Sequence, residues 1–203
     1  MGASQPDHAR AFVSRHQERM KDEWGTMAAY HSFALHPSSF LLHPFAMTDP
    51  LLEYRERLLN RLEAVVSEIA DTVAAVPESR WHQPLRAGAR PPHAIIAHLR
   101  DVERNAYAPR LRRLLDEDMP EFESFDPEKW EADRYNPDEP LTALLAEYAG
   151  LRETEMSLLR PLTSRGWARC GRHITFGVRT VQWWVERALR HAEEHLRELR
   201  EQS

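Results

Sequence analysis

The sequence of residues 181–200 is VQWWVERALRHAEEHLRELR, and its pattern decides the fold. Apolar side chains recur there every three or four residues, which is the period of an amphipathic α-helix. They fall at Val181, Trp184, Val185, Ala188, Leu189, Ala192, Leu196 and Leu199. The charged residues between them, Arg187 included, are assigned to the opposite face. The stretch therefore predicts a long helix that buries one side.

Three earlier stretches show the same period, and we predict helices over residues 50–76, 91–120 and 140–160. Thr48-Asp49-Pro50 supplies a capping side chain and a first-turn proline, which mark a helix start. Pro77 ends the first helix, and Pro109 predicts a kink inside the second. No stretch gives a convincing strand. Four long amphipathic helices predict an all-α fold, a four-helix bundle.

The chain divides by composition into an appendage and a domain. Residues 1–46 are rich in His, Ser, Phe and Met and are predicted to be an N-terminal appendage, while residues 47–203 form the bundle domain. Because Met47 directly precedes a helix start, residues 1–46 are either a natural extension or upstream sequence outside the native protein. Residues 118–140 hold several prolines, many acids and four aromatic residues, and predict a long loop pinned to the bundle.

Composition narrows the class of protein. A chain of 203 residues with 42% hydrophobic and 29% charged residues suits one water-soluble globular domain. The net charge is −5 and both signs are interleaved, which argues against a nucleic-acid partner. No stretch is apolar enough to span a membrane. Cys170 is the single cysteine, so it forms no internal disulfide; we expect an ordinary loop thiol and a cytoplasmic location.

Histidines supply the candidate chemistry. His191 and His195 are four residues apart on the apolar face of the last helix, so both imidazoles are expected to point inward. His98 lies between Ile95 and Val102 on the buried side of the second helix. The residues alone leave two interpretations open, which are satisfied core histidines and a shared metal ion. Three imidazole ligands would leave coordination positions free, as in catalytic sites.

Several other residues have alternative roles. Glu103 follows His98 by five residues, and it either transfers protons or accepts a hydrogen bond from a metal-binding group, or it is a partner in an ion pair. Asp101 is expected on the polar face, in solvent.

His173 either approaches the open side of the metal or packs its own loop. Trp183 and Trp184 are adjacent, so one is expected to face outward, as part of a homodimer interface or as a half-buried surface ring.

Three runs of sequence resemble the DinB-like (damage-inducible) family. They are PHAIIAHLRDVE (residues 92–103), HITFGVRT (residues 173–180) and ALRHAEEHLREL (residues 188–199). The similarity extends from about residue 47 to residue 200. It implies a four-helix bundle, often dimeric, in which a histidine triad binds nickel, zinc or a related divalent ion. By position, the triad would be His98, His191 and His195.

The resemblance also implies a chemistry. The family includes transferases that use the thiol bacillithiol and isomerases that depend on mycothiol. A cation with open positions lowers the pKa of a bound water or thiol. We therefore expect a metal-dependent enzyme, a thiol S-transferase, with a low-molecular-weight thiol as co-substrate and a small electrophilic molecule as substrate. The alternatives are a metal-dependent hydrolase, a non-catalytic metal-binding bundle and a helical interaction domain without metal.

Overall fold

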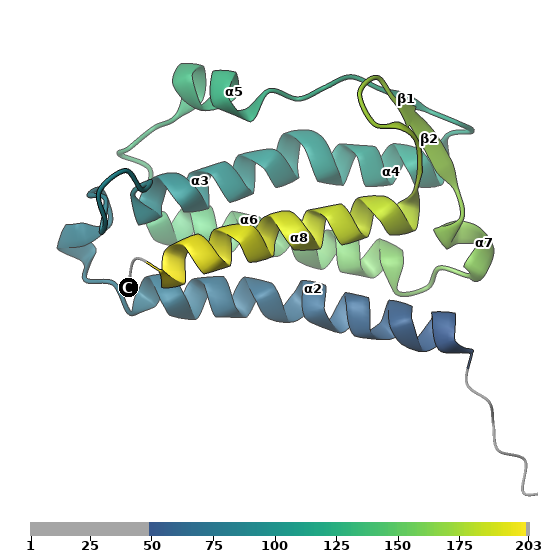
Figure 1. Cartoon of the computed structure of the whole chain (residues 1–203), viewed down its shortest axis with the longest axis horizontal. Coiled ribbons are helices and arrows are strands. Elements are labelled where there is room, and N and C mark those ends of the chain that lie inside the picture. The colour runs from purple at the N-terminus through teal and green to yellow at the C-terminus, as the bar shows by residue number, and fades with distance from the viewer. Residues whose placement is uncertain (1–48, 202–203) are drawn as a thin grey trace, which may run out of the picture. The chain divides into compact units, whose positions relative to one another are not determined.

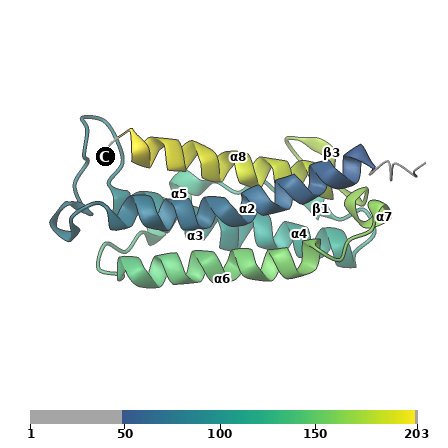
Figure 2. The ribbon, with the colours of Figure 1, turned by 90° about the horizontal axis from the view of Figure 1, so that it is seen from below.

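The computed structural model describes residues 49–201, and the predictions for residues 1–46 lie outside this range. The long helices are α2 (Pro50–Ala74), α3 (Pro92–Val102), α4 (Ala108–Asp116), α6 (Leu141–Leu159) and α8 (Val181–Arg200). A π-helical turn, Glu103–Tyr107, joins α3 to α4 without a break. Figures 1 and 2 show α2, α3–α4, α6 and α8 lying alongside one another. This arrangement confirms the four-helix bundle.

Local sequence explains where these helices begin and end. Asp49 caps α2, because its carboxylate accepts a hydrogen bond of 3.0 Å from the amide of Leu51, and Pro50 occupies the first helical position as predicted. Thr180 caps α8 by accepting from the amide of Trp183 at 3.2 Å. In the second helix Pro109 lacks an N–H and its ring conflicts with the carbonyl one turn back. The π turn directly before Pro109 is the local adjustment to it.

Short elements complete the domain. They are the 3₁₀ turn Glu78–Arg80, the helices α5 (Pro127–Arg134) and α7 (Ser164–Trp167), and the strands β1 (Glu121–Phe122), β2 (Cys170–His173) and β3 (Gly177–Thr180). β1 pairs in parallel with β2, with Phe122 opposite His173, and β2 pairs antiparallel with β3. Gly177 closes the hairpin with a φ of 69°, which favours glycine.

These short elements correct three expectations. The absence of strands was a wrong prediction, and Cys170 belongs to β2, not to a loop. Residues 118–140 are not wholly a loop either, because they contain β1 and α5. In Figure 1, α5 and the strands lie along the side of the bundle formed by α3, α4 and α8. Within the described residues, no helix is both long enough and apolar enough to cross a bilayer.

The bundle interior divides into two apolar clusters that meet near the middle of α8. One cluster includes Val102 and Ala188, and the other includes Leu99 and Ala192. His98 directly precedes Leu99 on α3 and lies one turn before Val102, and His191 lies between Ala188 and Ala192 along α8. The histidines therefore lie at the boundary between the two apolar clusters.

Candidate metal centre

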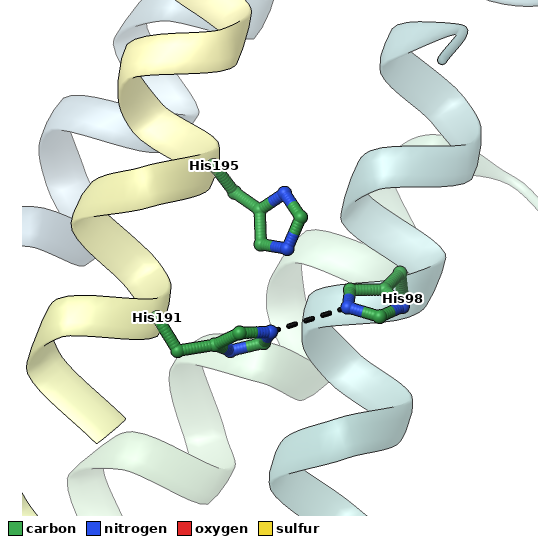
Figure 3. Close-up of side chains that lie close together, drawn as sticks. All are labelled: His98, His191 and His195. Carbon is green, nitrogen blue, oxygen red and sulfur yellow. Dashed lines mark hydrogen bonds between the residues drawn. The ribbon is translucent and has the colours of Figure 1, made fainter. Parts of the chain in front are cut away.

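Three histidines from two helices converge in the bundle. Figure 3 shows His98 on α3 facing His191 and His195 on α8. The Nε2 atoms of His98 and His191 are 3.2 Å apart, and one nitrogen from each of the three rings lies within 4.8 Å of the other two. A tetrahedral zinc ion with Zn–N bonds of about 2.0–2.1 Å holds neighbouring nitrogens about 3.3 Å apart. The His98–His191 pair matches this spacing, and the three side chains together could hold one divalent ion.

The environment keeps the imidazoles neutral. Burial, and then repulsion from His195, lower the pKa of His98 from 6.5 to about 3. Burial, reinforced by His195 and His98, lowers the pKa of His191 to about 2. Burial also lowers the pKa of His195, although Glu198 opposes this shift. Neutral imidazole is the form that binds a metal, so the rings are ready to act as ligands near neutral pH.

Carboxylates lie near the Nδ1 atoms of two of the three imidazole rings. Glu198 lies one turn after His195 and its Oε2 is 2.9 Å from Nδ1 of that ring, which directs Nε2 toward the triad. On the other side, Oε2 of Glu131 on α5 is 3.9 Å from Nδ1 of His98 and 3.2 Å from Arg90. Carboxylates that hold the second nitrogen of a ligating histidine are the usual outer shell of a metal site. Sequence reasoning missed both, although Glu198 had a usable signal in its spacing from His195.

Glu103 is buried in an ion-pair cluster. Its Oε2 accepts a hydrogen bond of 2.6 Å from Arg152 on α6, and Arg152 also donates to Glu155 at 2.8 Å. Burial, and then the neighbouring Glu103, raise the pKa of Glu155 well above 4.5. Burial alone would lower the pKa of Arg152, but the combined attraction of Glu103, Tyr148 and Glu155 outweighs it and raises that pKa. The interhelical ion pair left open by the sequence is thus the contact that Glu103 makes.

A cavity of about 260 Å³ opens beside His191. Its walls come from the α3–α4 segment, from the chain between β1 and α5, from the β2–β3 hairpin and from α8. The lining residues are Val102, Ala106, Tyr107, Arg110, Ser124, Phe125, Pro127, His173, Thr175, Phe176, Arg187 and His191. The triad therefore has one side that a small molecule can reach.

At this site two sequence expectations, for Arg187 and Asp101, change, and one of the alternatives for His173 is supported. Arg187, assigned to the solvent face of the last helix, lines the cavity one turn before His191. Asp101, expected in solvent, is 9% exposed and pairs with Arg100 at 2.6 Å. His173 packs its own hairpin, since its Nδ1 accepts from the amides of Thr175 at 3.0 Å and Phe176 at 3.3 Å, and it also lines the cavity.

The adjacent tryptophans differ in exposure, as expected. Trp184 is 3% exposed, whereas Trp183 is half-buried and carries the guanidinium of Arg179 over its ring at 5.1 Å. Trp183 thus corresponds to the half-buried surface ring among the two alternatives, and the homodimer stays a prediction.

Two solved structures resemble this chain in fold. YfiT from Bacillus subtilis, described as a probable metal-dependent hydrolase with an unusual four-helix bundle topology, superposes with a TM-score of 0.68. It shares 24% identity over 74% of this chain and 86% of its own. The four-helix bundle protein TT2238 gives a TM-score of 0.50 and 24% identity, over 72% of this chain and 98% of its own. Curated proteins gave no match.

These two likenesses concern the fold, and the family follows from the sequence itself. The DinB superfamily model matches residues 61–199, which include both histidine-bearing helices and the hairpin between them. The chain therefore belongs to the DinB superfamily.

Proposed function

We propose that the chain is a metal-dependent enzyme that acts on a small electrophilic molecule. His98, His191 and His195 would hold one divalent ion, with zinc and nickel the ions that the family resemblance favours. When bound, such an ion lowers the pKa of a water or thiol placed on it, so that a nucleophile forms near neutral pH. The observation that carries the proposal is the convergence of three neutral imidazoles next to an accessible cavity.

The chain's own residues prepare the site in three ways. Glu198 fixes the ring of His195, and the apolar neighbours of the triad keep bulk water away from its buried side. Tyr107 lines the cavity, and its ring centroid is 5.8 Å from that of His191. Burial raises the pKa of Tyr107 to about 12, so its hydroxyl stays protonated and can donate a hydrogen bond to a bound molecule.

The nucleophile distinguishes two versions of the proposal. The family resemblance favours a low-molecular-weight thiol and thus an S-transferase. The description of YfiT as a probable metal-dependent hydrolase favours water. In both versions the nucleophile bonds to the electrophilic atom of the substrate and a leaving group departs with the electron pair of the broken bond. Only the thiol version requires a co-substrate.

The test uses untagged protein in two assays. Bacillithiol, mycothiol and glutathione are each combined with monochlorobimane, and hydrolysis of aryl esters is measured without thiol. We expect turnover in one assay, loss of turnover after chelation, and recovery when zinc or nickel is returned to the wild type but not to His195→Ala. Turnover that survives complete chelation would contradict the proposal. Metal-loaded protein that is inactive in both assays would favour the non-catalytic metal-binding bundle.

Glu103 is part of this proposal as a positioning residue. Its carboxylate pairs with Arg152, and it adds to the raised pKa of Tyr107, so its influence on the cavity passes through these neighbours. We expect Glu103→Gln to move the alkaline limb of the pH profile of kcat to lower pH, because Glu103 helps to raise the pKa of Tyr107. A variant that loses stability yet keeps the wild-type pH profile would show that Glu103 only supports the fold.

A further inference from the structure

The cavity beside the triad carries positive charge that nothing in its walls balances. Arg110 on α4 and Arg187 on α8 both line it, and none of the lining residues within 49–201 is Asp or Glu. Over the same range, neither guanidinium forms an ion pair. Arg110 donates one hydrogen bond, of 2.8 Å, to the backbone carbonyl of Glu123. Repulsion from Arg187 contributes, after burial, to a lowered pKa of Arg110, so the two charges lie near each other.

Aromatic rings hold both guanidiniums in place. The guanidinium carbon of Arg110 is 5.0 Å from the ring centroid of Trp184, and that of Arg187 is 4.4 Å from the centroid of Phe176. A cation over an aromatic face uses the flat side of the guanidinium and leaves its in-plane N–H groups free. Two arginines fixed in this way are prepared to bind an oxyanion with little loss of side-chain freedom.

The remaining walls add donors and an apolar floor. His173 accepts two backbone hydrogen bonds on Nδ1, so the neutral ring carries its proton on Nε2, where no partner lies within the described part of the chain. Burial, with repulsion from Arg110 and Arg187, lowers the pKa of His173 and keeps this neutral form. Phe125, Phe176 and Pro127 supply apolar contacts. A volume of about 260 Å³ suits a small organic molecule.

We propose that this cavity binds a small organic anion and that Arg110 and Arg187 hold its carboxylate or comparable oxyanion, while the rest of the molecule lies against the aromatic walls beside His191. This inference rests on the proposed function, because it assigns the substrate class of the same site. The enzyme would then select acidic electrophiles over neutral ones of equal shape.

The probes are benzoate, phenylphosphonate and the neutral benzamide, titrated calorimetrically into metal-loaded and metal-free protein. We expect at least one anion to bind about tenfold or more tightly than benzamide, since charge-assisted hydrogen bonds are worth more than neutral ones. Preference for benzoate assigns a planar carboxylate, and preference for phenylphosphonate a tetrahedral oxyanion. Equal binding of anions and benzamide, or no binding of any probe, would overturn the inference.

Matched variants locate the binding. Arg110→Gln and Arg187→Gln are each expected to weaken anion binding by about tenfold and to leave benzamide unchanged. The controls are Arg112→Gln on α4 and Arg190→Gln on α8, both exposed arginines that do not line the cavity. Circular dichroism and metal content verify that each variant folds.

The titration of metal-free protein separates this inference from the proposed function. Arginine-dependent binding without metal supports the inference even if the metal site fails. Anion binding that requires metal and ignores both arginines would mean direct ligation to the ion, and would overturn the inference while leaving the metal site intact.

Discussion

At the scale of residues, one carboxylate fixes the orientation of a ring of the triad and a second carboxylate lies near another ring. Glu198 hydrogen-bonds Nδ1 of His195, and Glu131 approaches Nδ1 of His98 from a separate helix. In both rings this leaves Nε2 for the centre of the triad. The triad itself was accessible from the sequence, because spacing and apolar neighbours place the three histidines inside. Glu131 was not, because its approach depends on how α5 folds back over α3.

Removing the hydrogen bond behind His195 should weaken metal binding without unfolding the protein. Glu198→Gln keeps the size of the side chain but loses the charge that holds the imidazole, so we expect zinc affinity to fall by about 10- to 100-fold. Competition with a chelator of known affinity measures the change. The control is Glu194→Gln, an exposed neighbour on the same helix. Equal affinities in the two variants would contradict the assigned role of Glu198.

Arg152 should be essential for stability. It is 3% exposed and is the cation shared by Glu103 and Glu155. Arg152→Met leaves Glu103 buried without its partner, so we expect the free energy of unfolding to fall by about 3–5 kcal/mol. Arg160→Met, which breaks an exposed pair with Glu63, should cost at most about 1 kcal/mol. Urea denaturation compares them, and similar losses in both variants would argue against a critical buried pair.

At the scale of elements, a helix could be predicted when its own sequence carries an apolar period. An element that depends on contacts with residues far away in the sequence could not. Helices α2, α6 and α8 repeat apolar residues within their own sequence, and their positions were predicted closely. β1 depends on pairing with β2, 51 residues later in the chain by the register of Phe122 with His173. α5 has no buried residue, so it carries no apolar period to detect. Every residue of α3 is buried, so its sequence does not distinguish a core face from a solvent face. The sequence also gives no sign of the π turn that follows α3.

Two glycine-to-alanine substitutions test the space around the backbone, one in the small sheet and one in α6. A Cβ on Gly171 of β2 would lie 2.7 Å from Phe122 and 2.8 Å from the carbonyl of Pro120, so Gly171→Ala should destabilise the domain by about 1–3 kcal/mol. A Cβ on Gly150, inside α6, would meet nothing within 4 Å. Gly150→Ala should therefore stabilise the domain, by about 0.5–1 kcal/mol. Thermal denaturation of both variants gives the answer, and a harmless Gly171→Ala would contradict the close contact.

At the scale of the whole molecule, the buried histidines should make the metal-free protein sensitive to acid. In the folded chain the pKa of His98 is about 3, whereas 6.5 is the value of a free imidazole. Between these values the unfolded chain takes up a proton on His98 and the folded chain does not. The free energy of unfolding therefore loses a contribution from His98 as pH falls below about 6.5.

Glu155 acts in the opposite direction, because its pKa is raised in the folded state and its stabilising contribution appears as pH falls. The comparison must therefore be made against a variant. Between about pH 7.5 and about pH 5.5, we expect His98→Gln to remove roughly 1.4 kcal/mol of the acid-induced loss of stability. Urea denaturation of metal-free wild type, His98→Gln and the exposed-site control His82→Gln measures this difference. Identical pH dependence in wild type and His98→Gln would contradict a buried neutral His98.

The proposed function depends on His98, His191 and His195 holding an ion together. The most direct measurement is the metal content of untagged protein, equilibrated with zinc or nickel, desalted and analysed by mass spectrometry. The wild type and His82→Ala should retain about one ion per chain, while His191→Ala should retain almost none and stay helical by circular dichroism. A wild type without metal, or a His191→Ala variant that keeps its full complement, would contradict the account.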